Sequence, residues 1–348
     1  MSTLQQQVES VRNAHGVPAL GALILSSTRV LEVALTGKRR ADEETPVREE
    51  DRFHIGSCTK AMTATLIARL VDAGKLRWEQ TIGETFPALK SEIREAYHAV
   101  TLEQLLLHRG GIPEDRAPDP ALMLRLRALS GDMQTQRRQA LVAVLQREPA
   151  APPGSQMLYS NFGYMIAGAI AEQATGEPWE TLMRRWVFNP LKMRRVGFGA
   201  PGKPARKPDQ PRGHLGQCRT PVEPGPLADN PPVLGPAGTV HCALRDWAKF
   251  AQLHLWIAQG KRTALLKPET ARRLHEDPYK QGYSMGWGTV SRSWAKGQVL
   301  MHAGSNTMWY ALAVLAPALD RGWLIVTNCG SDAAQQACEQ LLHELAHP

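Results

Sequence analysis

The sequence predicts an α/β (α+β) protein in which an antiparallel sheet, flanked by helices, adjoins an all-helical domain. Segments with strand character lie towards the two ends of the chain, and helical patterns fill its middle. We therefore assign residues 1–75 and 238–348 to the sheet domain and residues 76–237 to the helical domain. The active site is expected at the junction of the two domains.

The first elements are a helix and a hairpin. Residues 3–13 have a helical pattern, and residues 19–26 and 30–36 are apolar runs joined by a short turn. A second helix is expected after Ser57, because apolar residues recur at every fourth position from Met62 to Leu70.

The rest of the chain alternates between helical patterns and turns. Residues 200–236 are rich in proline and glycine without periodicity, which predicts a long loop. Strands are expected near the C-terminal end, followed by a closing helix. The predicted helices are 101–108, 133–147, 164–174, 178–188, 243–258 and 332–346, and the predicted strands are 283–287, 299–301, 309–316 and 323–327.

The composition is that of a globular protein, with 43% hydrophobic and 21% charged residues. The net charge is +8, but the basic excess in residues 192–219 has few aromatic side chains, so we predict a solvated loop and no nucleic-acid partner. No apolar run approaches the ~18 residues of a membrane span, and the first residues lack the features of a signal peptide. A cytoplasmic location without a membrane partner is expected, and no oligomeric state is indicated.

The segment Ser57-Cys58-Thr59-Lys60 carries a possible nucleophile. A serine hydroxyl needs a base, and a lysine three residues later lies on the same side of a helix. The helix N-terminus favours developing negative charge. The alternative is a capping serine with a surface lysine, and on spacing alone it is the commoner case. The same spacing from Ser293 to Lys296 precedes a short apolar run and is interpreted as a chance match.

Tyr159 and Asn161 are candidate partners, because they follow a Pro-Pro-Gly turn and precede a helix. A phenol beside a lysine ammonium loses its proton more easily, so Tyr159 could be the base for the serine. The alternative is a buried, hydrogen-bonded tyrosine.

A third candidate segment is His302-Ala303-Gly304-Ser305, at the end of a predicted strand. Gly304 would allow close approach to the strand edge. Backbone N–H groups of Ser57 and Ser305 could then form an oxyanion hole. His302 could orient a substrate carboxylate or carbonyl, although a strand-end histidine beside a turn is the commoner case.

Together these three segments resemble the S-x-x-K, Y-x-N and K/H-x-G boxes of the serine β-lactamase and penicillin-binding-protein superfamily, in its class C-like branch. Residues 101–113 and 283–288 also resemble that family, and the resemblance covers about residues 10 to 345. It implies the fold predicted above, with the site between the two domains.

The resemblance also implies a role for each residue. Ser57 would be the acylated nucleophile, Lys60 would keep it poised for proton transfer, and Tyr159 would be the general base. Asn161 would bind the substrate and Lys60. The N–H groups of Ser57 and Ser305 would hold the oxyanion.

His302 departs from the lysine of class C β-lactamases and resembles family esterases, including family VIII carboxylesterases, and D-amino-acid peptidases. A histidine with a pKa near its ordinary value of about 6.5 is only partly charged at neutral pH. We therefore expect a carboxylesterase for small acyl esters. The alternatives are a β-lactamase or D-amino-acid peptidase or amidase and, more remotely, a non-catalytic ligand-binding member. Residues 115–130, the 200–236 loop and Trp309-Tyr310 are expected to shape the acyl pocket.

Other motifs are given less weight. The pattern His343-Glu344-x-x-His347 is that of a zinc protease, but it has no third ligand downstream. Gly197-x-Gly199-x-x-Gly202 follows no clear strand, and no G-x-S-x-G elbow occurs. We predict no metal and no cofactor. The five cysteines, at 58, 218, 242, 329 and 338, form no C-x-x-C pair, and their odd number disfavours a full disulfide framework.

Overall fold

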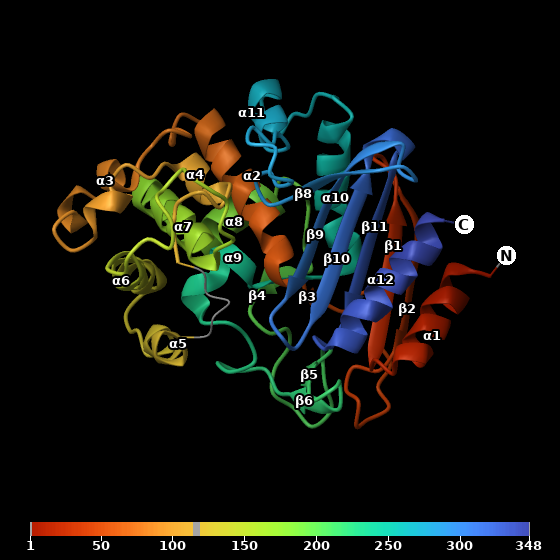
Figure 1. Ribbon diagram of the computed structural model, residues 1–348. Coiled ribbons are helices and arrows are strands. Elements are labelled where there is room, and N and C mark those ends of the chain that lie inside the picture. The colour runs from red at the N-terminus through yellow and green to blue at the C-terminus, as the bar shows by residue number, and fades with distance from the viewer. Residues whose placement is uncertain (1, 114–118, 348) are drawn as a thin grey trace.

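The computed structural model describes residues 2–113 and 119–347. Its main sheet has six antiparallel strands in the order β2-β1-β11-β10-β9-β8, drawn from the two ends of the chain (Figure 1). This confirms the predicted sheet. The strands are β1 (Ala19–Leu25), β2 (Val30–Gly37), β8 (Gly288–Arg292), β9 (Gly297–Ser305), β10 (Tyr310–Ala316) and β11 (Arg321–Thr327).

Helices cover both faces of this sheet (Figure 1). On one face α1 (Leu4–His15) and α12 (Asp332–Ala346) lie against each other, and α1 buries Leu4, Val8 and Val11 at helical spacing. α10 (Leu244–Ala258) packs on the opposite face, against β1, β10 and β11. The apolar residues of these two faces form two separate cores.

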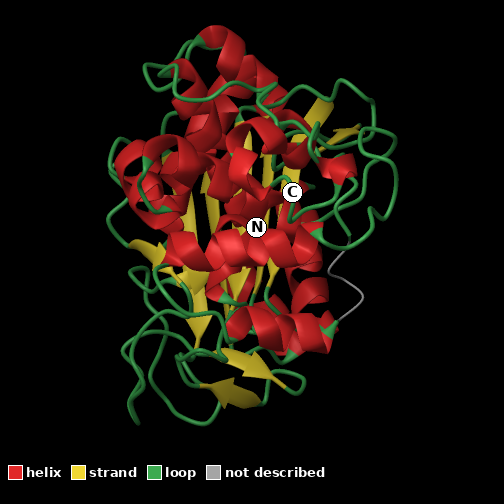
Figure 2. Cartoon of the chain, turned by 90° about the vertical axis from the view of Figure 1, so that its left-hand side faces the viewer, coloured by secondary structure: helices red, strands yellow, loops and turns green. Residues whose placement is uncertain are grey.

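The larger core continues from the sheet through α2 (Thr59–Asp72) into the helical region, where α2 contacts α7 and α9. In Figure 2, viewed from the side of the helical region, helices overlie the strands. Because one core runs through both parts, the boundaries at residues 75 and 238 stay a prediction. The remaining helices are α3 (Ile82–Thr85), α4 (Leu102–Leu106), α5 (Pro120–Arg127), α6 (Met133–Leu145), α7 (Asn161–Thr175), α8 (Trp179–Met183), α9 (Gly235–Gly238) and α11 (Pro268–Arg273).

Two sequence predictions need correction. The strand expected at 283–287 is wrong, because Gly286 has φ of +85° and only one isolated bridge, between Tyr283 and Gly288, forms there. The 200–236 segment is not a structureless loop. It contains the hairpin of β5 (Gly213–Leu215) and β6 (Thr220–Val222). A separate small sheet joins β3 (Phe53–His54), β7 (Val240–Cys242) and β4 (Val196–Phe198).

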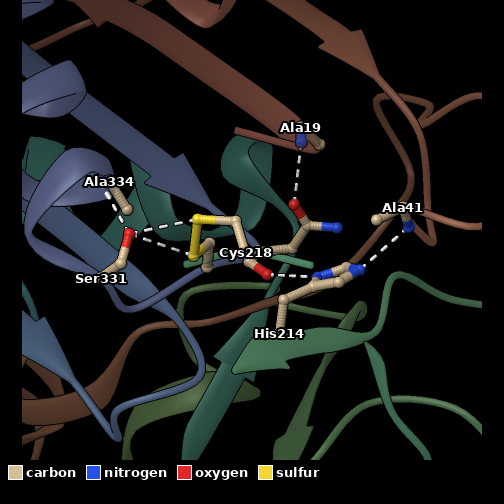
Figure 3. The surroundings of a disulfide bond; sticks show 8 residues. Ala19, Ala41, His214, Cys218, Ser331 and Ala334 are labelled. Carbon is tan, nitrogen blue, oxygen red and sulfur yellow. Dashed lines mark hydrogen bonds between the residues drawn. A yellow bond between two sulfur atoms is a disulfide. The ribbon is translucent and has the colours of Figure 1, made fainter. Parts of the chain in front are cut away.

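A disulfide between Cys218 and Cys329 fastens the β5–β6 hairpin to the segment after β11 (Figure 3). Beside it, His214 Nδ1 donates to the carbonyl oxygen of Asn328 at 2.7 Å, and His214 Nε2 accepts the N–H of Ala41 at 3.0 Å. The other three cysteines, Cys58, Cys242 and Cys338, are buried free thiols. Within the described residues, no helix is both long and apolar enough to cross a membrane.

Candidate active site

Ser57 lies on a tight turn between β3 and α2. Residues Gly56–Cys58 form a single 3-10 turn, and α2 begins at Thr59, so Ser57 is at the N-terminal end of the helix as expected. The turn is held in place because the Thr59 hydroxyl accepts the N–H of Val240 at 3.1 Å. Ser57 itself is half-buried and faces a cavity.

Lys60 lies one helical turn further on, and its side chain is completely buried. Its Nζ is 3.1 Å from Ser57 Oγ, 2.5 Å from Asn161 Oδ1 and 2.9 Å from the carbonyl oxygen of Ala237. The Asn161 and Ala237 oxygens can only accept, so two hydrogens of Nζ point at them. The remaining position of Nζ faces Ser57 Oγ, where it can donate a proton or, as a neutral amine, receive one.

Tyr159 is brought to the same place, with Lys60 Nζ 4.7 Å from the centre of its ring. Its position is set by the start of α7, where Ser160 is the N-cap and accepts the N–H of Gly163. Three segments predicted to be partners, Ser57 to Lys60, Tyr159 to Asn161 and His302 to Ser305, therefore meet around one cavity.

His108 lies in the 101–113 segment that resembles the family, but the sequence predicts no role for it. Its ring is 4.3 Å from that of Tyr159, and its Nδ1 accepts the N–H of Ser160 at 3.1 Å. Its hydrogen is therefore on Nε2, which lies 3.2 Å from the Tyr283 hydroxyl. The backbone of His108 has a left-handed φ of 58°, and its ring packs against the Tyr159 segment. The Gly110-Gly111 pair after it was the available sequence signal for this turn.

His302 lies on β9, where it is 9% exposed. Its Nδ1 donates to the carbonyl oxygen of Gly286 at 2.6 Å. Burial, assisted by the charge of Lys60, lowers the pKa of His302 to about 4. The His302 side chain is therefore neutral at pH 7, whereas a histidine with the ordinary pKa would be partly charged.

The end of β9 lies directly against the Ser57 turn. A Cβ atom on Gly304 would come within 2.7 Å of the Ser57 nitrogen, and one on Gly56 within 2.4 Å of the Ser305 nitrogen. Both glycines are thus required for backbone contact. This contact brings together the two segments expected to donate to an oxyanion.

The cavity beside Ser57 has a volume of about 200 Å³. Larger cavities of about 350 and 480 Å³ lie around His275, near α10 and α11, and contain none of the predicted site residues. No charged side chain is found among the described residues that line the Ser57 cavity. These are Ser57, Met123, Asn161, Asn230, Leu234, Ala237, Gly238, Ser305, Asn306 and Thr307.

Only some of the segments predicted to shape the acyl pocket contribute residues to this lining. Met123 comes from the 115–130 segment, of which residues 115–118 lie outside the described residues, and Asn230 and Leu234 come from the 200–236 segment. Trp309 instead packs edge-on against Phe53, with ring centres 5.9 Å apart.

The other motifs remain apart from this site. His343 and His347 have ring centres 4.4 Å apart near the end of α12. In the described part of the chain, no three His, Cys, Asp or Glu side chains are grouped to hold a metal ion. Burial raises the pKa of the Cys58 thiol, whose Sγ donates to the carbonyl oxygen of His302, so Cys58 serves packing.

Comparison with known proteins gives the family directly. The family described as "Beta-lactamase" matches residues 4–346. The chain belongs to this β-lactamase family. Penicillin-binding protein 4 of Amycolatopsis lactamdurans is 30% identical, over 98% of this chain and 89% of that protein. Protein flp of Staphylococcus aureus (strain N315) is 23% identical, over 97% of this chain and 66% of that protein.

Comparison with solved structures shows that the chain has the fold of this family. The D-alanine carboxypeptidase AmpC of Burkholderia cenocepacia has a TM-score of 0.73 at 19% identity, covering 98% of this chain and 97% of its own. A D-stereospecific amidohydrolase from Streptomyces sp. has a TM-score of 0.71 at 22% identity, covering 99% and 97%. The octameric penicillin-binding protein homologue from Pyrococcus abyssi has a TM-score of 0.75 at 21% identity, covering 98% and 76%. The family and the enzyme class expected from the three boxes, a serine hydrolase, are confirmed.

Proposed function

We propose that the chain hydrolyses esters of small, uncharged acyl groups through an acyl-enzyme on Ser57. The observation that carries the proposal is the buried Lys60, whose Nζ contacts Ser57 Oγ and Asn161 Oδ1. A buried amine at hydrogen-bond distance from a serine on a helix N-terminus is the arrangement that activates a hydroxyl.

In the proposed reaction Ser57 Oγ attacks the ester carbonyl carbon, and its proton passes to the phenolate of Tyr159, which lies beside Lys60. Backbone N–H groups of Ser57 and Ser305 stabilise the oxyanion. Collapse of the intermediate breaks the bond to the alkoxy oxygen, which leaves as an alcohol after taking that proton. The Tyr159 phenolate then takes a proton from water, and the resulting hydroxide attacks the acyl carbonyl carbon. The bond to Ser57 Oγ breaks, the carboxylic acid leaves, and Tyr159 returns the proton to Ser57 Oγ.

The preference for uncharged substrates is supported by the cavity. Its described lining is uncharged, and His302 is neutral at pH 7. A neutral imidazole offers no fixed charge to a β-lactam or peptide carboxylate, whereas a lysine would. In this proposal, Asn161 binds the substrate from the cavity wall. His302 is not among the described residues that line the cavity, so its contact with substrate stays a prediction.

The second candidate is a β-lactamase or D-amino-acid peptidase or amidase that uses the same residues. The names of the relatives favour it, because they include a penicillin-binding protein, a D-alanine carboxypeptidase and a D-stereospecific amidohydrolase.

One substrate panel separates the candidates. Wild type and Ser57→Ala are compared on p-nitrophenyl butyrate, nitrocefin and a D-alanyl p-nitroanilide, and a fluorophosphonate probe is located by peptide mass. We expect labelling of Ser57 and the highest kcat/KM on the ester. Full activity in Ser57→Ala contradicts the mechanism, and a higher kcat/KM on nitrocefin or the amide selects the second candidate. A folded wild type that is neither labelled nor active is a ligand-binding member.

The cytoplasmic location stays a prediction, and so does the absence of nucleic-acid and membrane partners. The Cys218–Cys329 disulfide weighs against a reducing compartment, because such bonds form and persist mainly in oxidising ones.

A further inference from the structure

Asp229 has a buried carboxylate beside the Ser57 cavity, in the segment between β6 and α9, with its side chain 7% exposed. Both of its oxygens have partners. Oδ2 is 2.9 Å from His54 Nε2, and Oδ1 accepts from the Asn306 side-chain amide at 2.9 Å and from the backbone N–H of Asn230 at 2.7 Å. None of the predicted roles uses this carboxylate.

The contact with His54 leads directly to the nucleophile turn. The N–H of Gly56 donates to His54 Nδ1 at 3.1 Å, so Nδ1 carries no hydrogen. The ring hydrogen is therefore on Nε2 and points at Asp229. Through this chain of two hydrogen bonds, Asp229 holds the backbone N–H immediately before Ser57.

The contact with Asn306 leads to the other side of the cleft. Asn306 follows Ser305 directly, and its Oδ1 accepts the N–H of Met308 at 3.2 Å. Its side chain is thereby fixed between the turn after β9 and Asp229. A single carboxylate thus links the Ser57 turn to the segment that carries Ser305.

We propose that Asp229 is a positioning residue that sets the relative placement of the Ser57 and Ser305 backbone N–H groups. The inference rests on the proposed function, since those two groups are the proposed oxyanion donors. Asp229 acts through His54 and Asn306 and does not itself touch the substrate. An asparagine could not replace it, because one amide oxygen cannot accept on both sides and the NH₂ group would face a donor.

Because the oxyanion forms only after attack, the loss should fall on kcat. We expect Asp229→Ala to lower kcat on p-nitrophenyl butyrate by about 10- to 100-fold with KM little changed, since small misplacements of reacting groups cost factors of this size. Asp229→Asn should lie between Asp229→Ala and wild type. The rate of fluorophosphonate labelling should fall in parallel, because the phosphonyl oxygen occupies the same hole.

Asp246 provides the matched control. It is also a buried aspartate, accepting from the N–H groups of Arg194 and Arg195, but it lies on α10 outside the cavity lining. Asp246→Ala should lower the melting temperature and leave kcat per folded molecule unchanged. Asn306→Ala tests the other arm, and its effect should not add to that of Asp229→Ala.

Each outcome decides the proposal. A folded Asp229→Ala with wild-type kcat, or with a raised KM alone, overturns it, as does an equal kcat loss in Asp246→Ala. If Asp229→Ala does not fold, Asp229→Asn and Asn306→Ala are read by the same criteria. A wild type that the probe does not label at Ser57 overturns the proposed function and this inference together. A labelled wild type with fully active Asp229 variants overturns only the inference.

Discussion

Lys60 and Asn161 are joined by a hydrogen bond of 2.5 Å between Nζ and Oδ1, although they are 101 positions apart in the chain. The bond connects α2, which lies beside the sheet, to Asn161, the first residue of α7 in the helical region. It therefore holds the Lys60 side chain against a residue of the helical region.

Replacing this amide by a carboxylate should separate activity from stability. In Asn161→Asp an adjacent negative charge offsets the positive charge of Lys60, so the Tyr159 phenolate is less stabilised and proton transfer from Ser57 to Tyr159 is opposed. We expect kcat to fall by about 100-fold, the size of an acid–base contribution, with the melting temperature unchanged or higher. Gln173→Glu, the same change on the exposed side of α7, is the control. Wild-type kcat in Asn161→Asp would show that the charge beside Tyr159 does not control proton transfer from Ser57.

A methyl group at Gly304 should force β9 away from the Ser57 turn. The added Cβ would lie 2.0 Å from the carbonyl oxygen of Ile55, a backbone atom that cannot rotate away. Gly304→Ala should lower the unfolding free energy by about 1–3 kcal/mol, as overpacking does. It should also lower kcat, by more than the loss of folded protein explains. Urea denaturation and ester kinetics measure the two effects. Gly225→Ala, whose Cβ would meet nothing closer than 4.0 Å, should change neither. An active, stable Gly304→Ala would contradict the close contact.

The Cys218–Cys329 disulfide predicts a thiol count. Denatured without reductant, the protein should expose three thiols, and after reduction five. The bridge closes a loop of 111 residues. Its loss in Cys218→Ser/Cys329→Ser should therefore lower the unfolding free energy by about 5 kcal/mol on the chain-entropy account. Cys338→Ser, at a buried free thiol, controls for the substitution itself. Five reactive thiols in protein kept from reductant would contradict the bond.

Buried histidines predict a loss of stability in mild acid. Burial lowers the pKa of His241 and of His302 to about 4, and of His275 to about 3, and it also lowers those of His214 and His254. Between about pH 6.5 and pH 4 the unfolded chain binds protons at these sites and the native protein does not. Their contribution is thus complete above about pH 6.5 and decreases as the pH falls, by up to about 1.4 kcal/mol per unit for each histidine.

His241→Asn isolates one of these contributions. The unfolding free energy is measured in urea between about pH 6.5 and pH 4. Its slope against pH should be smaller in His241→Asn than in wild type, by the contribution of one bound proton. Parallel curves for wild type and His241→Asn would contradict the assignment of a neutral, buried His241.

Most of the fold could be predicted because strong periodicity marks its elements. Residues 133–147 and 243–258 were expected to be helical, and α6 and α10 occupy Met133–Leu145 and Leu244–Ala258. The strand predicted at 283–287 failed because its aromatic and apolar residues, Tyr283, Met285 and Trp287, are buried in a non-extended turn around Gly286. Alternation of residue types does not distinguish that turn from a strand.

The site could be predicted only where side chains carry chemistry in a recognisable order. Ser57, Tyr159 and His302 stand in such an order, and the structure gathers their segments. Asp229 and Asn306 could not be found, since polar residues in aperiodic segments have no local signal and act only through long-range contacts. The neutral state of His302 was likewise unpredictable, because it follows from burial in the folded protein, assisted by the charge of Lys60.

The order of the strands has a consequence for biosynthesis. The nucleophile turn emerges from the ribosome early, yet the strand that it contacts, β9, is made some 240 residues later, as the separation of 244 between Cys58 and His302 illustrates. The sheet also pairs β1, at Ala19–Leu25, with β11, at Arg321–Thr327. A nascent chain therefore carries Ser57 and Lys60 without their β9 neighbour until residues 297–305 have been synthesised. Such long-range pairing is slow to form, so assembly of the site depends on the late meeting of distant segments.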